Sequence, residues 1–210
     1  MRQLYIIPLV ILVLFAFNIP ANAAYKGGIT YSIPIEYKNL SETELKIKAE
    51  SYFSQALQSE EWVLNSDFTN ALNLYNILLN INPNKVDYVI KLGILYDKLG
   101  KDRQAKGNFA RAIGIDPSKP GPYFYFGEFY YRRELYRQAL KYYQKALERA
   151  GGPSYALYFR LGDIYEKFGD TKQALQFYQQ AQSISPNEDM STRIQRTTSA
   201  NSTNNMYYRK

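Results

Sequence analysis

Apolar residues recur three or four positions apart along most of the chain between residues 41 and 188. That spacing places them on one face of an α-helix, so each stretch predicts an amphipathic helix. Leu92 and Tyr96 mark one such helix, and Ala105 and Phe109 mark the next. Gly100 lies between them, where a chain that leaves a helix often needs a positive φ. The pattern therefore predicts an antiparallel hairpin of two helices.

This hairpin pattern repeats along the chain with a period near 34 residues. Its positions are occupied by Leu92, Gly93, Tyr96, Gly100, Ala105, Phe109, Ala112 and Pro117. The following copies read Phe126, Gly127, Tyr130, Glu134, Ala139, Tyr143, Ala146, Gly151 and Leu161, Gly162, Tyr165, Gly169, Ala174, Tyr178, Ala181, Pro186. A weaker upstream copy reads Gln58, Ser59, Trp62, Ser66, Ala71, Tyr75, Leu78 and Pro83. We therefore predict a repeat domain over 41–188, with repeats at 52–85, 86–119, 120–154 and 155–188.

A period near 34 residues with small, aromatic, small and Pro positions resembles the tetratricopeptide repeat. The resemblance implies an all-α fold, a right-handed superhelical solenoid of about four helix-turn-helix repeats. A single hairpin cannot bury both of its apolar faces, so stacked neighbours are expected to stabilise one another. The small side chain of Gly93 is expected to let the two helices of its hairpin approach closely beside Phe109.

The turns of the repeats carry their own predictions. Asp102 follows Gly100, and its carboxylate is expected to accept amide hydrogen bonds at the start of the second helix. Pro117 is expected to end that helix and to bias Asp116 away from the helical region. The third repeat has Glu134 where Gly is expected. Its turn must either strain this residue or take another shape.

Residues 1–23 have the layout of a secretory signal peptide, with a basic start, an apolar run over 4–17 and a small-residue site at 21–23. The alternative is an uncleaved membrane anchor, but the run contains Pro8 and is shorter than the roughly 20 residues that span a bilayer. We therefore expect an exported protein of the periplasm or the extracellular space, of a bacterial type. No membrane span is expected after cleavage.

An extended linker is predicted over residues 24–40, because Ile29, Tyr31, Ile33 and Ile35 alternate with polar or small residues. Pro34 argues against a central strand. The segment is either a tether or a strip that packs against the repeats. Both alternatives stay open at this point.

The two ends of the repeat domain also have predicted structures. Ser41 and Glu44 are predicted to form a capping box at the start of a long helix that reaches almost to residue 65. This helix is interpreted as an N-terminal capping helix that is continuous with the degenerate first repeat. Residues 189–210 are polar and are predicted to be largely disordered, with a possible short capping helix that uses Met190 and Ile194. Alternatively, the exposed end of the fourth repeat contacts another subunit.

Composition narrows the chemistry. The chain has no His and no Cys, which removes the commonest general base, the thiol nucleophile and the usual transition-metal ligands. We therefore predict no enzyme activity, no cofactor and no metal. A net charge of +7 favours solubility and a mild preference for anionic partners rather than nucleic-acid binding. An enzyme or sugar-binding platform over residues 123–126 is the minor alternative.

Family resemblance also implies a concave groove lined by the first helix of each repeat. Its predicted binding residues are Ile90, Ile94, Asp97, Lys98, Phe124, Glu128, Tyr131, Arg132, Phe159, Asp163, Glu166 and Lys167. The Lys, Asn and Arg clamp by which one subgroup binds a chaperone's C-terminus is missing, since apolar or small residues such as Ile90 and Gly121 replace it. We therefore predict a scaffold that binds a protein or peptide partner in this groove. The alternative is an assembly protein that forms homo-oligomers through its N-terminal segment and last helix.

Overall fold

The computed structural model describes residues 34–58, 66–186 and 188–207, with the backbone alone for 188, 189 and 200–207. The predicted signal peptide and most of the linker lie outside these ranges. The described elements are a 3-10 turn at Ile35–Tyr37 and the helices α1 (Glu42–Gln58), α2 (Ser66–Ile81), α3 (Val86–Lys98), α4 (Asp102–Ile115), α5 (Pro120–Tyr131), α6 (Tyr136–Arg149), α7 (Tyr155–Lys167), α8 (Thr171–Ile184) and α9 (Glu188–Tyr207).

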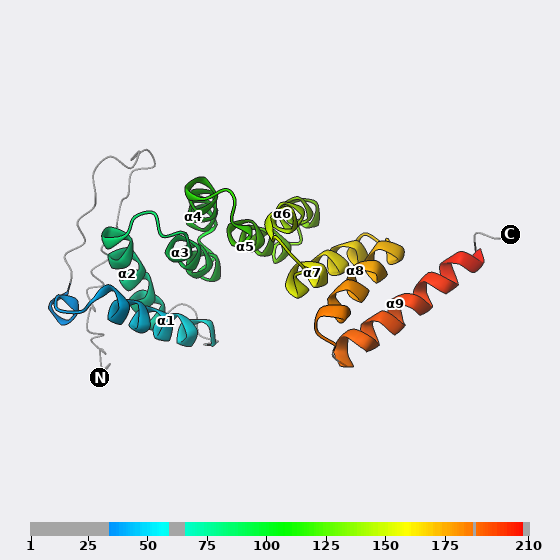
Figure 1. The fold of residues 1–210 in the computed structure, drawn as a ribbon, viewed down its shortest axis with the longest axis horizontal. Coiled ribbons are helices and arrows are strands. Elements are labelled where there is room, and N and C mark those ends of the chain that lie inside the picture. Colours follow the sequence, from blue (N-terminus) through cyan, green and yellow to red (C-terminus); the bar gives the residue numbers. More distant parts are fainter. Residues whose placement is uncertain (1–33, 59–65, 187, 208–210) are drawn as a thin grey trace, which may run out of the picture. The chain divides into compact units, whose positions relative to one another are not determined.

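Successive helices pack as hairpins: α1 with α2, α3 with α4, α5 with α6, and α7 with α8 (Figure 1). We call α1, α3, α5 and α7 the first helices and their partners the second helices. Neighbouring first helices also touch, since α1 contacts α3 and α3 contacts α5. The part of the chain that the structure describes contains helices and no strand, which confirms the predicted all-α repeat fold.

Buried apolar side chains connect each hairpin to the next. One cluster joins α1, α2 and α3 and includes Ala112 of α4, and another joins α5, α6 and α7. Phe109 of α4 and Phe126 of α5 belong to a further cluster between them, with ring centroids 5.6 Å apart. The apolar face of each hairpin is therefore buried partly by its neighbour, as expected for a repeat array.

A glycine of the first helix meets a ring of the second helix in three hairpins. A Cβ atom added at Gly93 would lie 2.6 Å from the Phe109 ring, and at Gly127 or Gly162 it would lie 2.6 or 2.5 Å from the ring of Tyr143 or Tyr178. These distances are shorter than any van der Waals contact between carbon atoms. The two helices of each of these hairpins can therefore lie this close together only because glycine has no side chain, as the sequence predicted for Gly93.

The turns inside the second, third and fourth hairpins share one backbone conformation. Gly100 and Gly169 have φ of 66° and 77°, and Glu134 has φ of 57° at the equivalent place. The third turn therefore keeps the shape of the others and holds a non-Gly residue in the left-handed region, which is unfavourable for a residue with a Cβ atom. Asp116 is extended, with φ of −144°, where α4 ends ahead of Pro117.

Asp102 does not have the role that its position suggested. It is the first residue of α4, the N-cap residue is Lys101, and the cap has no side-chain hydrogen bond. The Asp102 carboxylate instead accepts a hydrogen bond from Nε of Arg133, 3.0 Å away. A charged partner from the next hairpin thus replaces the amide contact that local sequence predicted. Capping by Asp does occur in α8, where Asp170 Oδ1 accepts from the amide of Gln173 at 3.0 Å.

The start of the repeat domain has the predicted capping box. The backbone amide of Ser41 donates to Glu44 Oε2 at 2.8 Å, and the amide of Glu44 donates to Ser41 Oγ at 3.3 Å. Tyr37 and Leu40, at the end of the linker, pack against the first core cluster. The last part of the predicted long helix lies outside the described residues, and α1 already pairs with α2, so the first hairpin begins before the predicted boundary at residue 52.

The C-terminal segment differs from its sequence prediction. It forms α9 over Glu188–Tyr207 and packs against α8. Met190 is only 1% exposed, and Ile194 packs against the same cluster of α8 side chains. Thr197 is buried one turn later, where its hydroxyl donates to the carbonyl of Arg193 at 2.9 Å. Met190, Ile194 and Thr197 therefore give one face of this mostly polar helix the contacts that hold it on α8.

Replacing Gly162 by Ala is expected to lower the free energy of unfolding by about 1–3 kcal/mol, because the new methyl group would overlap the buried Tyr178 ring. Gly107→Ala is the matched control. That residue lies within α4 with open space around it, so Ala is expected to stabilise the protein by about 0.4–1 kcal/mol. Urea denaturation of both variants measures the difference, and equal values would refute the close-approach argument.

Glu134→Gly is expected to raise the free energy of unfolding by about 0.5–1 kcal/mol, because it removes the left-handed strain at this turn. Gly100→Ala introduces the same strain in the second repeat and should act in the opposite direction. Thermal unfolding followed by circular dichroism tests the pair. A loss of stability in Glu134→Gly would show that the glutamate side chain contributes more than its backbone costs.

Candidate functional site

The predicted groove residues lie on α3, α5 and α7, with Arg132 directly after α5. They differ in exposure. Ile90, Asp97, Glu128 and Asp163 are buried, whereas the remaining members are partly or fully exposed. The surface that solvent reaches is therefore smaller than the predicted set, and it consists mainly of rings and cationic side chains.

The carboxylates of this face are occupied by cations from the following helix. These ion pairs are Glu50 with Lys91 at 2.8 Å, Asp97 with Arg133 at 2.7 Å, Glu128 with Arg160 at 2.6 Å and Asp163 with Arg193 at 2.7 Å. We call this series the carboxylate ladder. It links α1, α3, α5, α7 and α9 in chain order. Asp97, Glu128 and Asp163 thus hold neighbouring helices together, so a partner would not find them as free acceptors.

Glu128 lies at the centre of the ladder. Arg160 binds it with two parallel bonds, from Nε to Oε1 at 2.6 Å and from Nη2 to Oε2 at 3.0 Å. The buried Tyr143 hydroxyl donates to Oε1 as well. Burial would by itself lower the pKa of the Arg160 guanidinium, but the bonds to Glu128 outweigh it and raise the pKa. Burial and the Glu128 charge raise the pKa of Tyr143, so its hydroxyl stays a donor.

Asp163 is held by three groups. Arg193 Nη1 lies 2.7 Å from its Oδ1, and the Tyr178 hydroxyl donates to the same oxygen at 2.9 Å. Arg160 Nη1 lies 3.4 Å from Oδ2. Burial raises the pKa of Asp163 in spite of these contacts, which favour its charged form. Arg193 therefore compensates an acid that would otherwise be costly to bury.

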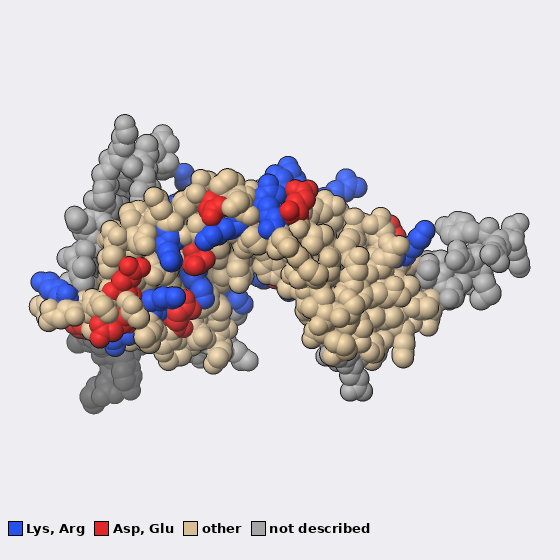
Figure 2. Space-filling view, in the orientation of Figure 1, with Lys and Arg blue, Asp and Glu red and all other residues tan. Residues whose placement is uncertain are grey.

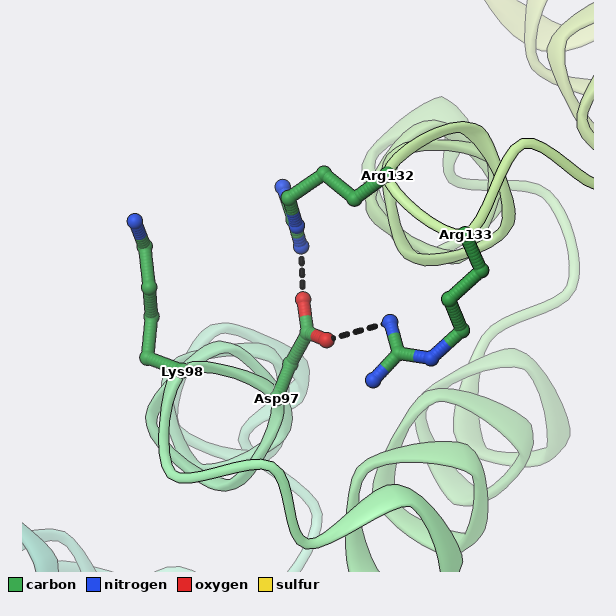
Figure 3. Close-up of a pocket in the computed structure, with 4 residues that line it drawn as sticks. All are labelled: Asp97, Lys98, Arg132 and Arg133. Carbon is green, nitrogen blue, oxygen red and sulfur yellow. Dashed lines mark hydrogen bonds and ion pairs between the residues drawn. The ribbon is translucent and has the colours of Figure 1, made fainter.

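The second repeat has a different arrangement. Phe109 replaces the tyrosine of the other hairpins, and the residue after Gly93 is Ile94 rather than an acid. The acid is instead Asp97, one turn later, where it forms ion pairs with Arg132 and Arg133. Together with Lys98, these residues line a surface pocket at the ends of α3 and α5 (Figure 3).

Aromatic side chains occupy the rest of this face. Phe124 lies against Tyr143 with ring centroids 5.7 Å apart, and Phe159 stacks on Tyr155 at 6.1 Å. The Arg193 guanidinium lies 5.0 Å from the centroid of Phe159, and that of Arg160 lies 5.0 Å from Tyr131. Each ring is thus fixed by a neighbouring side chain and remains partly buried. Fixed rings of this kind lose little freedom when they bind a ligand.

Sequence reasoning missed the cationic half of the ladder, whose members are Lys91, Arg133, Arg160 and Arg193. A signal was present, because Lys91, Arg160 and Arg193 occupy nearly equivalent positions in α3, α7 and α9. α5 has Tyr125 at this position, and Arg132 and Arg133 supply the charge from its end. A search for charges at the repeat period, in addition to small and aromatic residues, would have found most of them.

Charged side chains of both signs are interspersed on the visible face of the described helices, and over α7 and α8 that face is largely uncharged (Figure 2). Among the described residues, no three acidic side chains lie close enough together to hold a metal ion. None of the helices described combines the length and the apolar character that a bilayer span requires.

Comparison with protein families identifies the repeats. A family model described as tetratricopeptide repeat matches residues 123–187, and a second model of the same description matches residues 86–119. The matched segments contain most of α3 to α8. No curated protein matches this sequence significantly.

Solved structures share the fold at low sequence identity. MamA has a TM-score of 0.59 at 20% identity, over 77% of this chain and 82% of that chain. PilW, a type IV pilus biogenesis factor, has a TM-score of 0.57 at 18% identity, over 70% of this chain and 64% of that one. PilF of Pseudomonas aeruginosa has a TM-score of 0.59 at 15% identity, over 73% and 69%. At these identities the likeness concerns the fold.

Arg193→Ala is expected to lower the free energy of unfolding by about 1–3 kcal/mol, because it leaves the buried Asp163 with fewer partners. Hydrogen exchange should also speed up in α9, which Arg193 connects to α7. Arg196→Ala, an exposed position three residues later in the same helix, should change stability by no more than about 0.5 kcal/mol. Equal effects of the two changes would exclude the proposed anchoring of α9.

Proposed function

We propose, for a chain that carries tetratricopeptide repeats, a role as a non-enzymatic protein-interaction scaffold. In this proposal, the shared face of the first helices binds a peptide segment of a partner protein. Tetratricopeptide repeats generally serve as interaction scaffolds, and stacked helical hairpins offer extended surfaces for such binding.

The observation that carries the proposal is the composition of the exposed part of this face. The carboxylate ladder neutralises the acids, so the groups left for a partner are Ile94, Phe124, Tyr131 and Phe159 with cations beside them. Aromatic and Arg side chains are enriched among residues that dominate binding energy at protein interfaces. Such a face suits a peptide with apolar anchors.

The same proposal places the scaffold outside the cytoplasm, in the periplasm or the extracellular space. It rests on the signal-like pattern of residues 1–23. The absence of Cys means that an exported form would depend on its packed helices rather than on disulfides. A partner would then be another exported or envelope protein.

Assembly through the last helix is the alternative, and it has less support. α9 covers the apolar end of α8, where Met190 and Ile194 pack. Ile184 remains 40% exposed on α8 and is the best single position at which to test this contact. Light scattering of Ile184→Ala against the unaltered protein measures any change in oligomeric state.

Selection of displayed random peptides against the full chain tests the groove directly. We expect selected peptides to lose affinity roughly tenfold with Phe159→Ala or with Phe124→Ala, because both changes remove a ring from the first-helix face. Fluorescence anisotropy with a labelled selected peptide gives the dissociation constants, and circular dichroism confirms that each variant is folded.

The matched control is Ile184→Ala, which removes an exposed apolar side chain from a second helix. It should leave peptide affinity unchanged within about twofold. If the selected peptides bind Ile184→Ala weakly and both groove variants normally, the binding face is wrong. If no peptide is selected at all, the scaffold proposal itself loses its basis.

A further inference from the structure

The pocket formed by Asp97, Lys98, Arg132 and Arg133 differs in charge from the rest of the first-helix face. It lies where the C-terminal ends of α3 and α5 meet (Figure 3). Three of its four lining side chains are cationic. The single acid, Asp97, has a side chain that is only 1% exposed. A ligand that reaches this pocket therefore meets cations first.

Arg133 is a structural cation of this pocket. Its guanidinium donates to Asp97 Oδ1 at 2.7 Å, to the carbonyl of Phe129 at 2.9 Å and to Asp102 Oδ2 at 3.0 Å. It also lies 3.6 Å from the centroid of the Phe129 ring. Most of its donors and one of its faces are used within the protein, so it is poorly placed to bind a ligand.

Arg132 is bound less completely. It pairs with Asp97, and its other acidic neighbour, Glu128, is 3.8 Å away and already takes two bonds from Arg160. The Arg132 side chain remains 39% exposed. A guanidinium has five N–H donors, so several of them can still bind an acceptor from solvent.

Arg132 lies among other cations. Burial lowers its pKa, and the positive charges of Arg133 and Arg160 lower it further. The same cations that depress this pKa would be stabilised by an added negative charge. Lys98 adds a further positive charge and extends past Asp97 on the same side as Arg132 (Figure 3).

From this geometry we infer that Lys98 and Arg132 bind the carboxylate of an acidic side chain, Asp or Glu, within the peptide segment of the partner. This inference rests on the proposed function and specifies one residue of its ligand. Ile94 lies one turn before Lys98 on α3 and is partly buried. That separation, roughly 6 Å, matches two residues of an extended peptide, so an apolar residue is expected two positions from the acid.

The arrangement is particular to the second and third repeats. In the third and fourth hairpins, a tyrosine hydroxyl donates to the acid that follows the glycine. In the second hairpin, Phe109 has no hydroxyl, and two arginines converge on Asp97. Arg133 also binds Asp102, so Arg132, whose side chain is 39% exposed, is the arginine of this pair that a ligand can reach.

Selection of displayed peptides on the full chain tests this inference. We expect enrichment of Asp or Glu two positions from an apolar residue. For a selected peptide, Arg132→Gln should weaken binding roughly tenfold or more, and Lys98→Gln should weaken it severalfold, since each removes one charged hydrogen-bond donor. Binding should weaken as salt concentration rises. Replacing the peptide acid by Asn or Gln should remove the effect of both variants.

Lys141→Gln is the matched control, because it removes one positive charge from an exposed position on α6, a second helix. It should leave affinity unchanged. Selected peptides without an acid, or peptides that bind Arg132→Gln and Lys98→Gln normally, would overturn the inference. So would loss of binding on amidation of the peptide C-terminus, since the bound carboxylate would then be the terminal one.

Failure of the inference and failure of the proposed function give different results. If peptides bind through Phe159 and ignore Arg132, the groove stands and the acidic site is refuted. If no peptide binds any form of the protein, both are refuted. Each dissociation constant is measured at a temperature where the variant is fully folded, so that a loss of binding reports on the contact and not on unfolding.

Discussion

The contact on which the structure depends is the approach of an aromatic ring to a glycine backbone inside the second, third and fourth hairpins. It sets the distance between the paired helices, because any Cβ atom at Gly127 or Gly162 would overlap the facing tyrosine. It also sets the position of the tyrosine hydroxyl. The residue after each glycine is an acid, Glu128 or Asp163, and the hydroxyl donates to it. Packing within one hairpin therefore orients the acid that binds the next.

That connection explains which features the sequence could predict. Small and aromatic residues act within a hairpin, over separations of about half a repeat, so their period predicts the helices and the left-handed turn at Gly100. The capping box of Ser41 and Glu44 is equally local. Asp102 is the opposite case. Its place after Gly100 predicted an N-cap, but the Asp102 carboxylate instead accepts a hydrogen bond from Arg133, which is 31 residues away in the sequence. Ion pairs between hairpins depend on which first helices touch, and local pattern does not contain that information.

The C-terminal helix is a second feature that local sequence did not predict. A polar composition predicted little order, yet three buried or partly buried side chains at helical spacing and the two ion pairs of Arg193 hold α9 against α7 and α8. Arg193 gives α9 the cation that the ladder requires of a following helix. After Glu188 and Asp189 at its start, α9 contains no Asp or Glu. Within the described residues, Arg193 of α9 is the last cation of the carboxylate ladder, and α9 packs on α8 as a terminal cap would.

Burying a series of ion pairs is an expensive way to stabilise a protein, because desolvation of the charges offsets most of their attraction. Their better-supported use is to select one arrangement among several of similar energy. Apolar contacts between neighbouring helices tolerate sliding, whereas the two parallel bonds between Arg160 and Glu128 form in one register only. The ladder therefore fixes how the first helices lie beside one another and, with them, the rings and cations of their shared face. A face fixed before binding loses less conformational entropy when a partner arrives, which favours recognition by a preformed surface.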